Sequence, residues 1–443
     1  MPTSVVDIDL SADTAAPSQP TFNDIVLIEA TTVEPDSVDF NKVYSYTDPD
    51  DVESDTGEDF AVVGASEAVN AMGTQSWGVL LTELQEADEE IDDGTAVANA
   101  PIRGDTETVT VTVGDEEYTV VPTTSDPTEE EIAEGEAAVN FDTGVVFADS
   151  ADPVEVSYAY IGFDYIRDAL DRDDHDLIGL AGEQYDRAGI GDLDELTKIA
   201  GEKNLGVVGF QKEGAEYPTE QDALEAFQDI ASYVPSGDLL FNAHKDSDTY
   251  YPTAYTLGQL ATNQPWFDPF WDEVDGAGYP FDLNDTYSRE KVGDPATAET
   301  FEGGDAEREG PGNVLIEVND RVVLSNSLTT AGFDSDYRYF DIGRTQAFIA
   351  AEARDALTEL RLKSSQIPFT SDGRSRVLGA IRNRLSGFVG GSNAPLTEIS
   401  VTAPQINDID EEDVGARIFP GIEIDGQLAG NMHEFGVELH VRV

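Results

Sequence analysis

The residues best suited to chemistry in this chain are four histidines and 91 acidic side chains, and there is no cysteine. His175, His244, His433 and His440 stand far apart, and none belongs to the HExxH pattern that binds zinc on one helix face. The chain also lacks the GxxxxGKS/T phosphate loop and the GxSxG turn that presents a catalytic serine. We therefore predict that the protein is not an enzyme and has no catalytic residue, cofactor or metal ligand.

Carboxylates are too frequent in this chain for a close pair to indicate an acid–base site. Pairs such as Asp48 with Asp50, or Asp408 with Asp410, arise by chance at this density. The acidic stretch 48–59 lacks the glycine at the sixth position of a calcium-binding loop. We interpret this stretch as a solvated acidic loop.

The overall charge excludes several functions. The chain has 24 basic and 91 acidic residues, a formal net charge of −67 over 443 residues. Nucleic-acid binding needs a cationic surface, so we expect no direct nucleic-acid contact. No apolar run approaches the roughly 18 residues of a membrane span, and no secretory signal is visible, so we expect no membrane insertion. So many like charges repel one another within the folded chain. About 1 M salt shortens the Debye length to about 3 Å and screens this repulsion. We therefore predict a halophilic protein that loses structure or disassembles at low salt.

One stretch departs from the acidic composition. Residues 338–384 contain nine basic and five acidic residues, a local net charge of +4. Two interpretations are open at this point. The arginines could neutralise neighbouring carboxylates of the same chain, or they could form a face that docks on another acidic chain.

The first two thirds of the chain predict strands, one early helix and an α/β unit. A helix is expected over 66–85, with Ser66 as its N-cap. The Thr/Val alternation of 106–121 predicts a β-hairpin. From 163 to about 280, helices alternate with short apolar runs, which is typical of an α/β unit with parallel strands. Further strands are expected at 25–28, 139–147 and 154–160.

The last third predicts a hairpin, two helices and more strands. Two apolar runs flank Asn319-Asp320, a two-residue hairpin turn. Apolar residues then recur at helical spacing over 349–360 and 377–388. Strands are expected at 396–402 and near 416–424.

Both ends of the chain show the alternation of a β-strand. The apolar positions are Val6, Ile8 and Leu10 at the N-terminus, and Val437, Leu439 and Val441 at the C-terminus. An unpaired strand can add to the sheet of another subunit, and head-to-tail exchange of this kind builds rings or helical filaments. The alternatives are a frayed N-terminus and a C-terminal strand that completes its own sheet.

Several segments together resemble a known family. They are GNVLIEVNDRVVLSNSLTT, DYRYFDIGRTQAFIAAEARDALTEL, SRVLGAIRNRLSGFV, SVTAPQINDIDEEDVGARIFPGIEI and the closing FGVELHVRV. Their order is similar to that in the C-terminal region of contractile tail sheath proteins of tailed viruses and related injection machines. The region 20–95 resembles the opening of the same family. The chain departs from the family at 327–330, where SLTT replaces a segment that usually contains glycine.

The resemblance implies an α+β, multi-domain fold. The N- and C-terminal parts would build a sheath core from a mixed sheet and amphipathic helices, with β-rich and α/β insertions in the middle. The expected segments are an N-terminal arm (1–22), the N-terminal part of the core (23–100), a β-rich subdomain (101–162), an outward-facing α/β insertion (163–311), the C-terminal part of the core (312–432) and a C-terminal strand arm (433–443).

The resemblance also implies a function. The chain would be a sheath subunit that polymerises as stacked rings around an inner tube and contracts to drive the tube through the host envelope for genome delivery. Its partners would be further copies of itself, a tail tube protein, and baseplate and tail terminator proteins. The family's inner helices face the tube, which implies tube-facing positions for Arg374, Arg376, Arg382 and Arg384. The six terminal apolar residues named above would take part in strand exchange between subunits.

The expected location is the tail of a virion, assembled in the host cytoplasm. The resemblance points to a halophilic archaeal virus or a related contractile injection system. The acidic β-rich segments leave one alternative, a secreted or surface-exposed halophilic adhesin or binding protein. A halophilic hydrolase using the α/β unit is a weaker alternative, because no nucleophile with an aligned base can be named.

Overall fold

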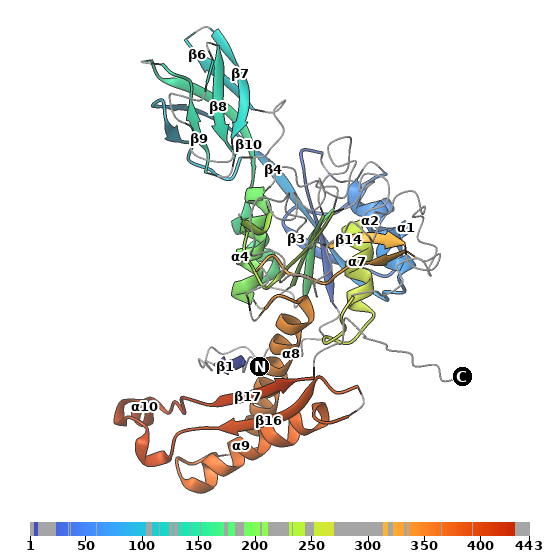
Figure 1. The fold of residues 1–443 in the computed structure, drawn as a ribbon, viewed down its shortest axis with the longest axis vertical. Helices are drawn as coiled ribbons and strands as arrows, with labels where there is room; N and C mark the ends of the chain where they lie inside the picture. The colour runs from blue at the N-terminus through green and yellow to red at the C-terminus, as the bar shows by residue number, and fades with distance from the viewer. Residues whose placement is uncertain are drawn as a thin grey trace, which may run out of the picture.

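The computed structural model describes residues 4–7 and 24–429 of the chain (Figure 1). Three parts follow one another along the long axis: a β-rich subdomain, a central sheet covered by helices, and a C-terminal module of helices and strands. This multi-domain α+β layout with a mixed sheet confirms the predicted fold class. The positions within the second range that are not described are 34, 36, 59, 103–108, 115, 124–126, 128–131, 134, 142, 151, 172–175, 182–189, 204–205, 211–229, 233, 244–251, 270–312, 318–321, 332–334, 336, 365 and 392.

The central sheet is mostly parallel. Its strands, in spatial order, are β15 (Val322–Leu324), β14 (Asn313–Glu317), β13 (Leu239–Ala243), β12 (Gly206–Phe210), β11 (Leu177–Leu180), β2 (Ile25–Thr31) and β4 (Trp77–Ile91). All neighbours from β14 to β4 are parallel. β15 is antiparallel to β14, and β3 (Lys42–Tyr46) is antiparallel to β4. Strands from three of the predicted segments (23–100, 163–311 and 312–432) therefore lie in one sheet. The boundaries of these segments remain predictions.

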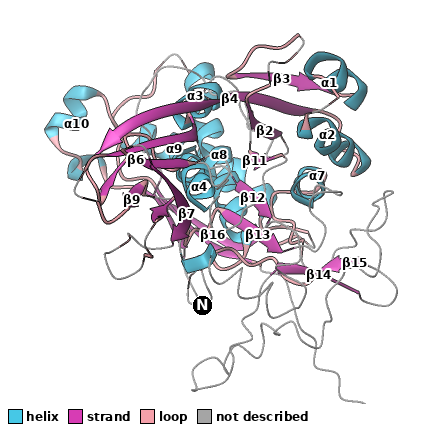
Figure 2. Cartoon of the chain, turned by 90° about the horizontal axis from the view of Figure 1, so that it is seen from above, coloured by secondary structure: helices cyan, strands magenta, loops and turns pink. Residues whose placement is uncertain are grey.

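Helices cover both faces of this sheet (Figure 2). Helices α1 (Pro49–Thr56), α2 (Ala61–Ala71) and α7 (Pro252–Ala261) lie on one face, and α3 (Phe163–Leu170) and α4 (Ile190–Lys203) lie on the other. Successive residues of β2 serve opposite faces, since Ile25 and Leu27 pack with the first group and Val26 and Ile28 with the second. A strand buried on both faces is apolar throughout, which explains the uninterrupted run in this segment.

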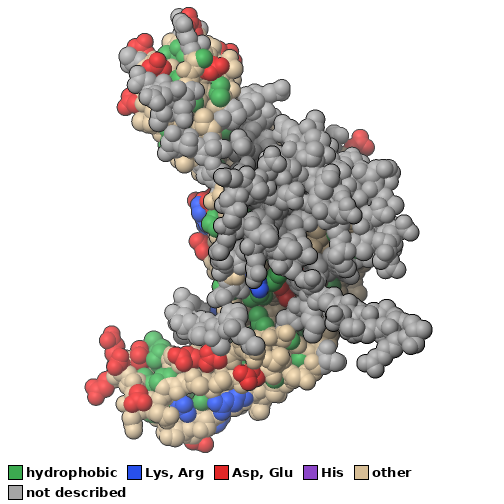
Figure 3. Space-filling model, viewed as in Figure 1, with side chains coloured by type: hydrophobic (Ala, Val, Ile, Leu, Met, Phe, Trp, Pro, Cys, Tyr) green, Lys and Arg blue, Asp and Glu red, His purple; other side chains and the backbone are tan. Residues whose placement is uncertain are grey.

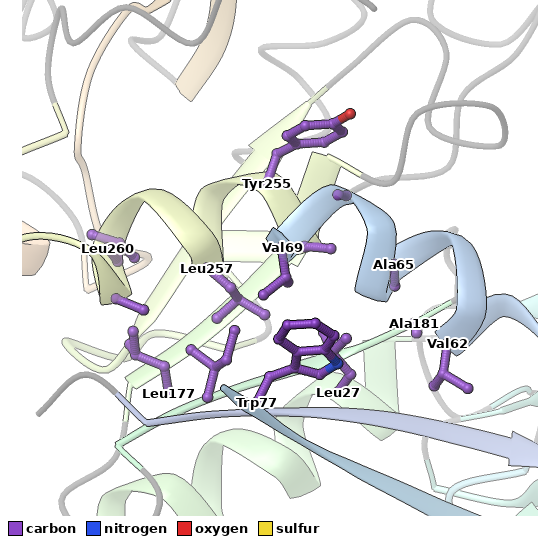
Figure 4. Close-up of a cluster of buried hydrophobic side chains, with 14 of the residues drawn as sticks. Leu27, Val62, Ala65, Val69, Trp77, Leu177, Ala181, Tyr255, Leu257 and Leu260 are labelled. Atoms are coloured by element: carbon purple, nitrogen blue, oxygen red, sulfur yellow. The ribbon is translucent and has the colours of Figure 1, made fainter. Parts of the chain in front are cut away.

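One of the two central cores surrounds Trp77, whose side chain is 2% exposed. In Figure 4 its indole lies among Leu27 of β2, Val69 of α2 and Leu257 of α7. The indole Nε1 donates a hydrogen bond to Ser66 Oγ at 2.9 Å, so its one polar atom is paired. Residues from widely separated parts of the chain therefore meet in one apolar cluster.

The predicted helix over 66–85 is wrong beyond its first turns. Helix α2 ends before Gly73, which adopts φ +85°, and β4 begins at Trp77. Ser66, predicted as an N-cap, is buried inside α2. The apolar run 77–81 is buried in the sheet, and such a run has no periodicity that separates a strand from a buried helix.

The β-rich subdomain grows out of the far half of β4. That half pairs antiparallel with β10 (Val154–Ile161) over eight residue pairs. Beyond β10 the order is β6 (Thr110–Val113), β7 (Glu116–Thr123), β8 (Glu136–Asn140), β9 (Val145–Phe147) and β5 (Thr95–Ala96). β5, the last strand in this order, directly follows β4 in the chain, so the two ends of the order lie close together. The strands therefore curl round a hydrophobic core of their own. The predicted hairpin is confirmed by β6 and β7.

The C-terminal module packs two helices against a small antiparallel sheet. The helices are α8 (Phe340–Lys363) and α9 (Ser371–Leu385), which confirms the predicted amphipathic pair. The sheet order is β1 (Ser4–Asp7), β17 (Glu423–Leu428) and β16 (Leu396–Thr402). The strand expected near 416–424 begins later, at Glu423, because α10 (Glu411–Ala416) and Arg417 at φ +65° occupy the chain before it.

Helix α8 joins the C-terminal module to the central sheet. Its 24 residues span about 36 Å, and its first turns are buried in the central part. Arg344 Nη2 donates to the carbonyl of Leu260 in α7 at 3.4 Å. Burial lowers the pKa of Arg344 to about 10, and the nearby carboxylates of Asp176 and Asp341 oppose that shift. The guanidinium is therefore held inside the joint as a cation.

An aromatic cluster supports the same joint one turn further along α8. Trp266, which follows α7, lies 5.4 Å from the ring of Phe348 in α8 and 6.1 Å from Phe388 after α9. The rings of Phe348 and Phe388 are 4.9 Å apart and perpendicular. Such contacts stabilise the joint beyond simple burial.

We expect Arg344→Met to lower the free energy of unfolding by about 3–5 kcal/mol, because it leaves the carboxylates of Asp176 and Asp341 buried without the guanidinium. Urea unfolding followed by tryptophan fluorescence measures the loss. Arg376→Met, at an exposed arginine of α9, is the control. Equal effects of the two substitutions would contradict a structural role for the buried cation.

Candidate assembly interface

The N-terminal strand lies on the C-terminal module. β1 is antiparallel to β17, with Val6 opposite the buried Ile424 and Asp7 opposite Glu423. Residues some 420 positions apart in sequence therefore pair in one sheet. This position fits the predicted arm, and the exchange of the strand between subunits remains a prediction. Among the predicted exchange residues, Ile8, Leu10, Val437, Leu439 and Val441 lie outside the described residues.

Local sequence explains why α9 begins where it does. The side chain of Thr370 accepts a hydrogen bond from the backbone N–H of Gly373 at 3.2 Å, which caps the helix. A Cβ at Gly373 would lie 1.9 Å from the carbonyl oxygen of Pro368, so only glycine allows this close turn. Arg382 and Arg384 stand in the last turn, where cations interact favourably with the helix dipole. Leu378, Ile381 and Leu385 pack into the core shared with α8 and β16.

All four predicted tube-facing arginines lie on α9, and two of them bind backbone carbonyls of β16 and of the loop after it. Arg374 donates from Nε to the carbonyl of Pro404 at 2.9 Å and from Nη2 to that of Ala403 at 2.7 Å. Arg382 Nη2 donates to the carbonyl of Val401 in β16. These bonds attach α9 to β16 and to the loop that follows it.

The other two arginines contact α8 and the α8–α9 loop. Arg384 forms an ion pair with Glu352, and its Nη2 lies 3.7 Å from the carboxylate of Asp355. The hydrogen bond to Glu352 raises the pKa of Arg384 above its ordinary value. Arg376 is exposed and donates to Ser364 Oγ at 2.7 Å and to the carbonyl of Gln366 at 3.3 Å.

The sequence left open whether these arginines neutralise carboxylates of their own chain or dock on another chain. Arg384 neutralises carboxylates of its own chain. Arg376 and Arg382 are exposed and retain donors that can face a partner. Figure 3 shows basic side chains gathered on the lower edge of the C-terminal module, with acidic side chains along its end and upper side. A tube-facing role for the four arginines stays a prediction.

Side-chain hydrogen bonds hold the segment 327–330, where the sequence departs from the sheath family. Asn313 brackets Leu328, since its Oδ1 accepts from the backbone N–H at 2.8 Å and its Nδ2 donates to the carbonyl at 2.6 Å. Thr330 Oγ1 donates to the carbonyl of Val234. The segment is buried, and Phe340 N then donates to the carbonyl of Ser327 as α8 begins. Sequence reasoning missed these buried polar contacts and Arg344, because polar residues carry no periodic signal of burial.

The histidines and carboxylates first considered for chemistry are not grouped as metal ligands in the described part of the chain. All four histidines lie outside the described residues. Among those described, no three His, Asp or Glu side chains are grouped as metal ligands, and no helix is long and apolar enough to cross a bilayer. The stretch 48–59, predicted as a loop, instead contains α1, with Asp48 as its N-cap. The Asp48 side chain accepts from Asp50 N at 3.1 Å, and Val52 is buried, so capping and packing decide this segment.

Solved structures of sheath proteins share this architecture. The helical sheath of the anti-feeding prophage in its contracted state matches with 13% identity and a TM-score of 0.55 over 100% of both chains. The sheath complex of an extracellular contractile injection system, PVC, also in the contracted state, matches with 12% identity and a TM-score of 0.55, over 99% of this chain and 97% of that one. This chain has the fold of contractile sheath proteins.

The sheath fold extends over the whole chain, including the middle region that the sequence resemblance did not cover. A chain from the anti-feeding prophage baseplate matches as well, with 13% identity and a TM-score of 0.54 over 100% of this chain and 99% of that one. No protein-family model and no curated protein sequence matches. The likeness is therefore one of fold, and it confirms the resemblance to the sheath proteins.

We expect Arg374→Ala and Arg382→Ala to loosen α9. Each removes charged hydrogen bonds to backbone carbonyls and lowers stability by about 1–3 kcal/mol. Hydrogen–deuterium exchange of the α9 amides, measured by mass spectrometry, should become faster. Arg376→Ala serves as the control, because its hydrogen bonds to Gln366 and Ser364 are exposed to solvent, and the expected change is about 0.5 kcal/mol or less. Exchange as slow as in this control would show that the carbonyl contacts do not stabilise α9.

Proposed function

We propose that the protein is the structural subunit of a contractile sheath. The observation that carries this proposal is the sheath fold over the full length of the chain. The neighbouring structures include sheaths in the contracted state, and a structural subunit of this kind performs no catalysis. The fold does not favour the adhesin alternative.

In the proposed assembly, copies polymerise as stacked rings around an inner tube. Contraction shortens the sheath and drives the tube through the host envelope, which delivers the genome. Strand arms at both ends of the chain connect neighbouring subunits through this transition, and the position of β1 at the edge of the β16–β17 sheet supports this role. In this proposal Val6, Ile8 and Leu10 act in the N-terminal arm, and Val437, Leu439 and Val441 act in the C-terminal arm.

The α9 side of the C-terminal module is proposed to face the tube. Arg376 and Arg382 are the exposed members of the set, whereas Arg374 and Arg384 act chiefly by holding α9 in place. The tube protein would then present an acidic surface. Baseplate and tail terminator proteins would be the partners at the two ends of the sheath.

The net charge of −67 supports a proposed origin in a salt-rich environment. The proposed particle is the tail of a halophilic archaeal virus or a related contractile injection system, assembled in the host cytoplasm. In low salt, repulsion between copies of so acidic a chain opposes assembly.

We expect the purified protein to form tubes or stacked rings in about 2 M salt and to lose them at about 10 mM salt, because screening of like charges is lost. Negative-stain electron microscopy and far-UV circular dichroism follow assembly and folding. Monodisperse particles in high salt would count against the proposed function. Unchanged circular dichroism and intact tubes in low salt would count against the halophilic origin alone.

We expect deletion of 435–443 to leave a folded monomer that does not polymerise, since the chain loses the strand that it donates. Size-exclusion chromatography with light scattering measures the mass, and circular dichroism measures folding. The control is His440→Asn, at a polar position of the alternation, which should assemble normally. Recovery of normal tubes from the truncated chain would refute the role of this arm.

A further inference from the structure

Two arginines of α8 have no partner within the described part of the chain. Arg354 and Arg361 lie seven residues apart, two helical turns and about 10 Å, on the same side of the helix. Neither forms an ion pair or hydrogen bond with a described residue. Leu362, about 100° round the helix from Arg361, is 78% exposed, more than any other large apolar side chain described. We call Arg354, Arg361 and Leu362 the α8 patch.

Carboxylates of α8 do not neutralise this patch. Glu352 and Asp355 lie toward Arg384 of α9, and Glu359 pairs with Lys363 at 2.7 Å. These acidic residues occupy a different stripe from Arg354 and Arg361, because a spacing of one or two residues turns the helix by 100° or 200°. The α8 patch is therefore a cationic stripe, with the exposed Leu362 beside it, on a strongly acidic protein.

A surface of opposite charge lies in the connection between β16 and β17. This connection, residues 405–421, is called the prong, and it contains α10 at the end of the C-terminal module (Figure 1). Val414 is 38% exposed and Ile418 is 44% exposed. Five carboxylates precede them without an ion pair to any described residue: Asp408, Asp410, Glu411, Glu412 and Asp413.

The base of the prong is held in place. Arg374 binds the carbonyls of Ala403 and Pro404 just before it, and the ring of Phe419 lies 6.4 Å from that of Phe369 in the α8–α9 loop. The prong and the α8 patch thus belong to one module, yet they form no ion pair with each other in the described chain. Each surface retains its charge for a partner.

We propose that the α8 patch docks the prong of a second copy of this chain. The two surfaces match in kind, since guanidinium groups face carboxylates and Leu362 faces Val414 and Ile418. Two chains of charge −67 otherwise repel, so a basic surface is a favoured place for contact. Salt screens ion pairs in direct contact less than it screens distant charges. Salt also strengthens the burial of apolar side chains. The contact between the α8 patch and the prong is therefore stable in concentrated salt.

This contact is heterologous, because one copy uses its α8 patch and the other its prong. It therefore repeats from copy to copy and closes into a ring or continues as a helix. The inference rests on the proposed function, which requires such a homopolymer. It adds a contact between folded modules to the strand arms.

Charge reversal tests the contact. The prong variant Glu411→Lys with Glu412→Lys, and the patch variant Arg354→Glu with Arg361→Glu, should each raise the concentration needed for assembly about tenfold or more. Assembly is measured by sedimentation at the lowest salt concentration at which the wild-type chain polymerises. A mixture of the two variants, or one chain carrying all four substitutions, should recover assembly because each lysine again meets a glutamate.

Two controls separate this effect from general changes of charge. Glu86→Lys with Glu90→Lys reverses exposed carboxylates on the far half of β4 and should leave assembly unchanged. Arg376→Glu, on the proposed tube-facing side, should leave copy-to-copy assembly unchanged in the absence of the tube. Normal assembly of the two single-surface variants, or failure of the four-substitution chain to recover while it remains folded, would overturn the inference.

A cross-link tests the same contact without polymers. The natural chain has no cysteine, so Leu362→Cys on one chain and Val414→Cys on another can form only the intended mixed disulfide or disulfides between identical copies. Mixing the two should yield mixed dimers under mild oxidation, in large excess over dimers of either variant alone. Tubes of wild-type protein without this cross-link would overturn the contact and leave the sheath function standing. The cross-link without tubes at any salt concentration would support the contact and contradict the sheath function.

Discussion

Helix α8 belongs to two parts of the molecule, and the burial of its first turns determines how they sit together. Phe340 packs so closely on Gly206 that a Cβ there would lie 2.7 Å from the phenyl ring, and a Cβ at Gly343 would lie 3.3 Å from the carbonyl of Gly237. Small residues thus let the helix approach the central strands. The Arg344 guanidinium then lies beside Leu260, Asp176 and Asp341, which fixes the rotation of the helix as well as its depth. The position of the C-terminal module depends on this buried joint.

The distribution of charge within the C-terminal module follows from its packing. Arg374, Arg382 and Arg384 are drawn into contacts that attach α9 to β16 and to α8, so part of the local positive charge is used internally. The prong carries its carboxylates at the far end of the module. Opposite charges are therefore separated within one packed module, a property that favours ordered contacts over random association.

Elements with a clear local pattern could be predicted, and elements governed by long-range contacts could not. Helix α9 shows apolar residues at helical spacing, and β6–β7 shows Thr/Val alternation before a turn, so both could be predicted. The run 77–81 has neither pattern, because β2, β3 and the helices bury it on both sides. The acidity of the stretch 48–59 predicts a loop, while capping by Asp48 and burial of Val52 make 49–56 a helix. Arg344 looked like one more arginine of a basic stretch, since nothing near it in the sequence signals burial.

The sequence alone determined the acidic character of the protein, most of its strands and helices, and its resemblance to sheath proteins. These properties depend on composition and on periodicities of two to four residues, which are visible along the chain. Only the tertiary structure decided that β2 pairs between β11 and β4, that β1 lies on β17, and that all four arginines of α9 bind within their own chain. Those outcomes depend on contacts between residues that are distant in sequence. Such contacts form only where apolar faces and backbone hydrogen bonds are satisfied together, and no local pattern contains that information.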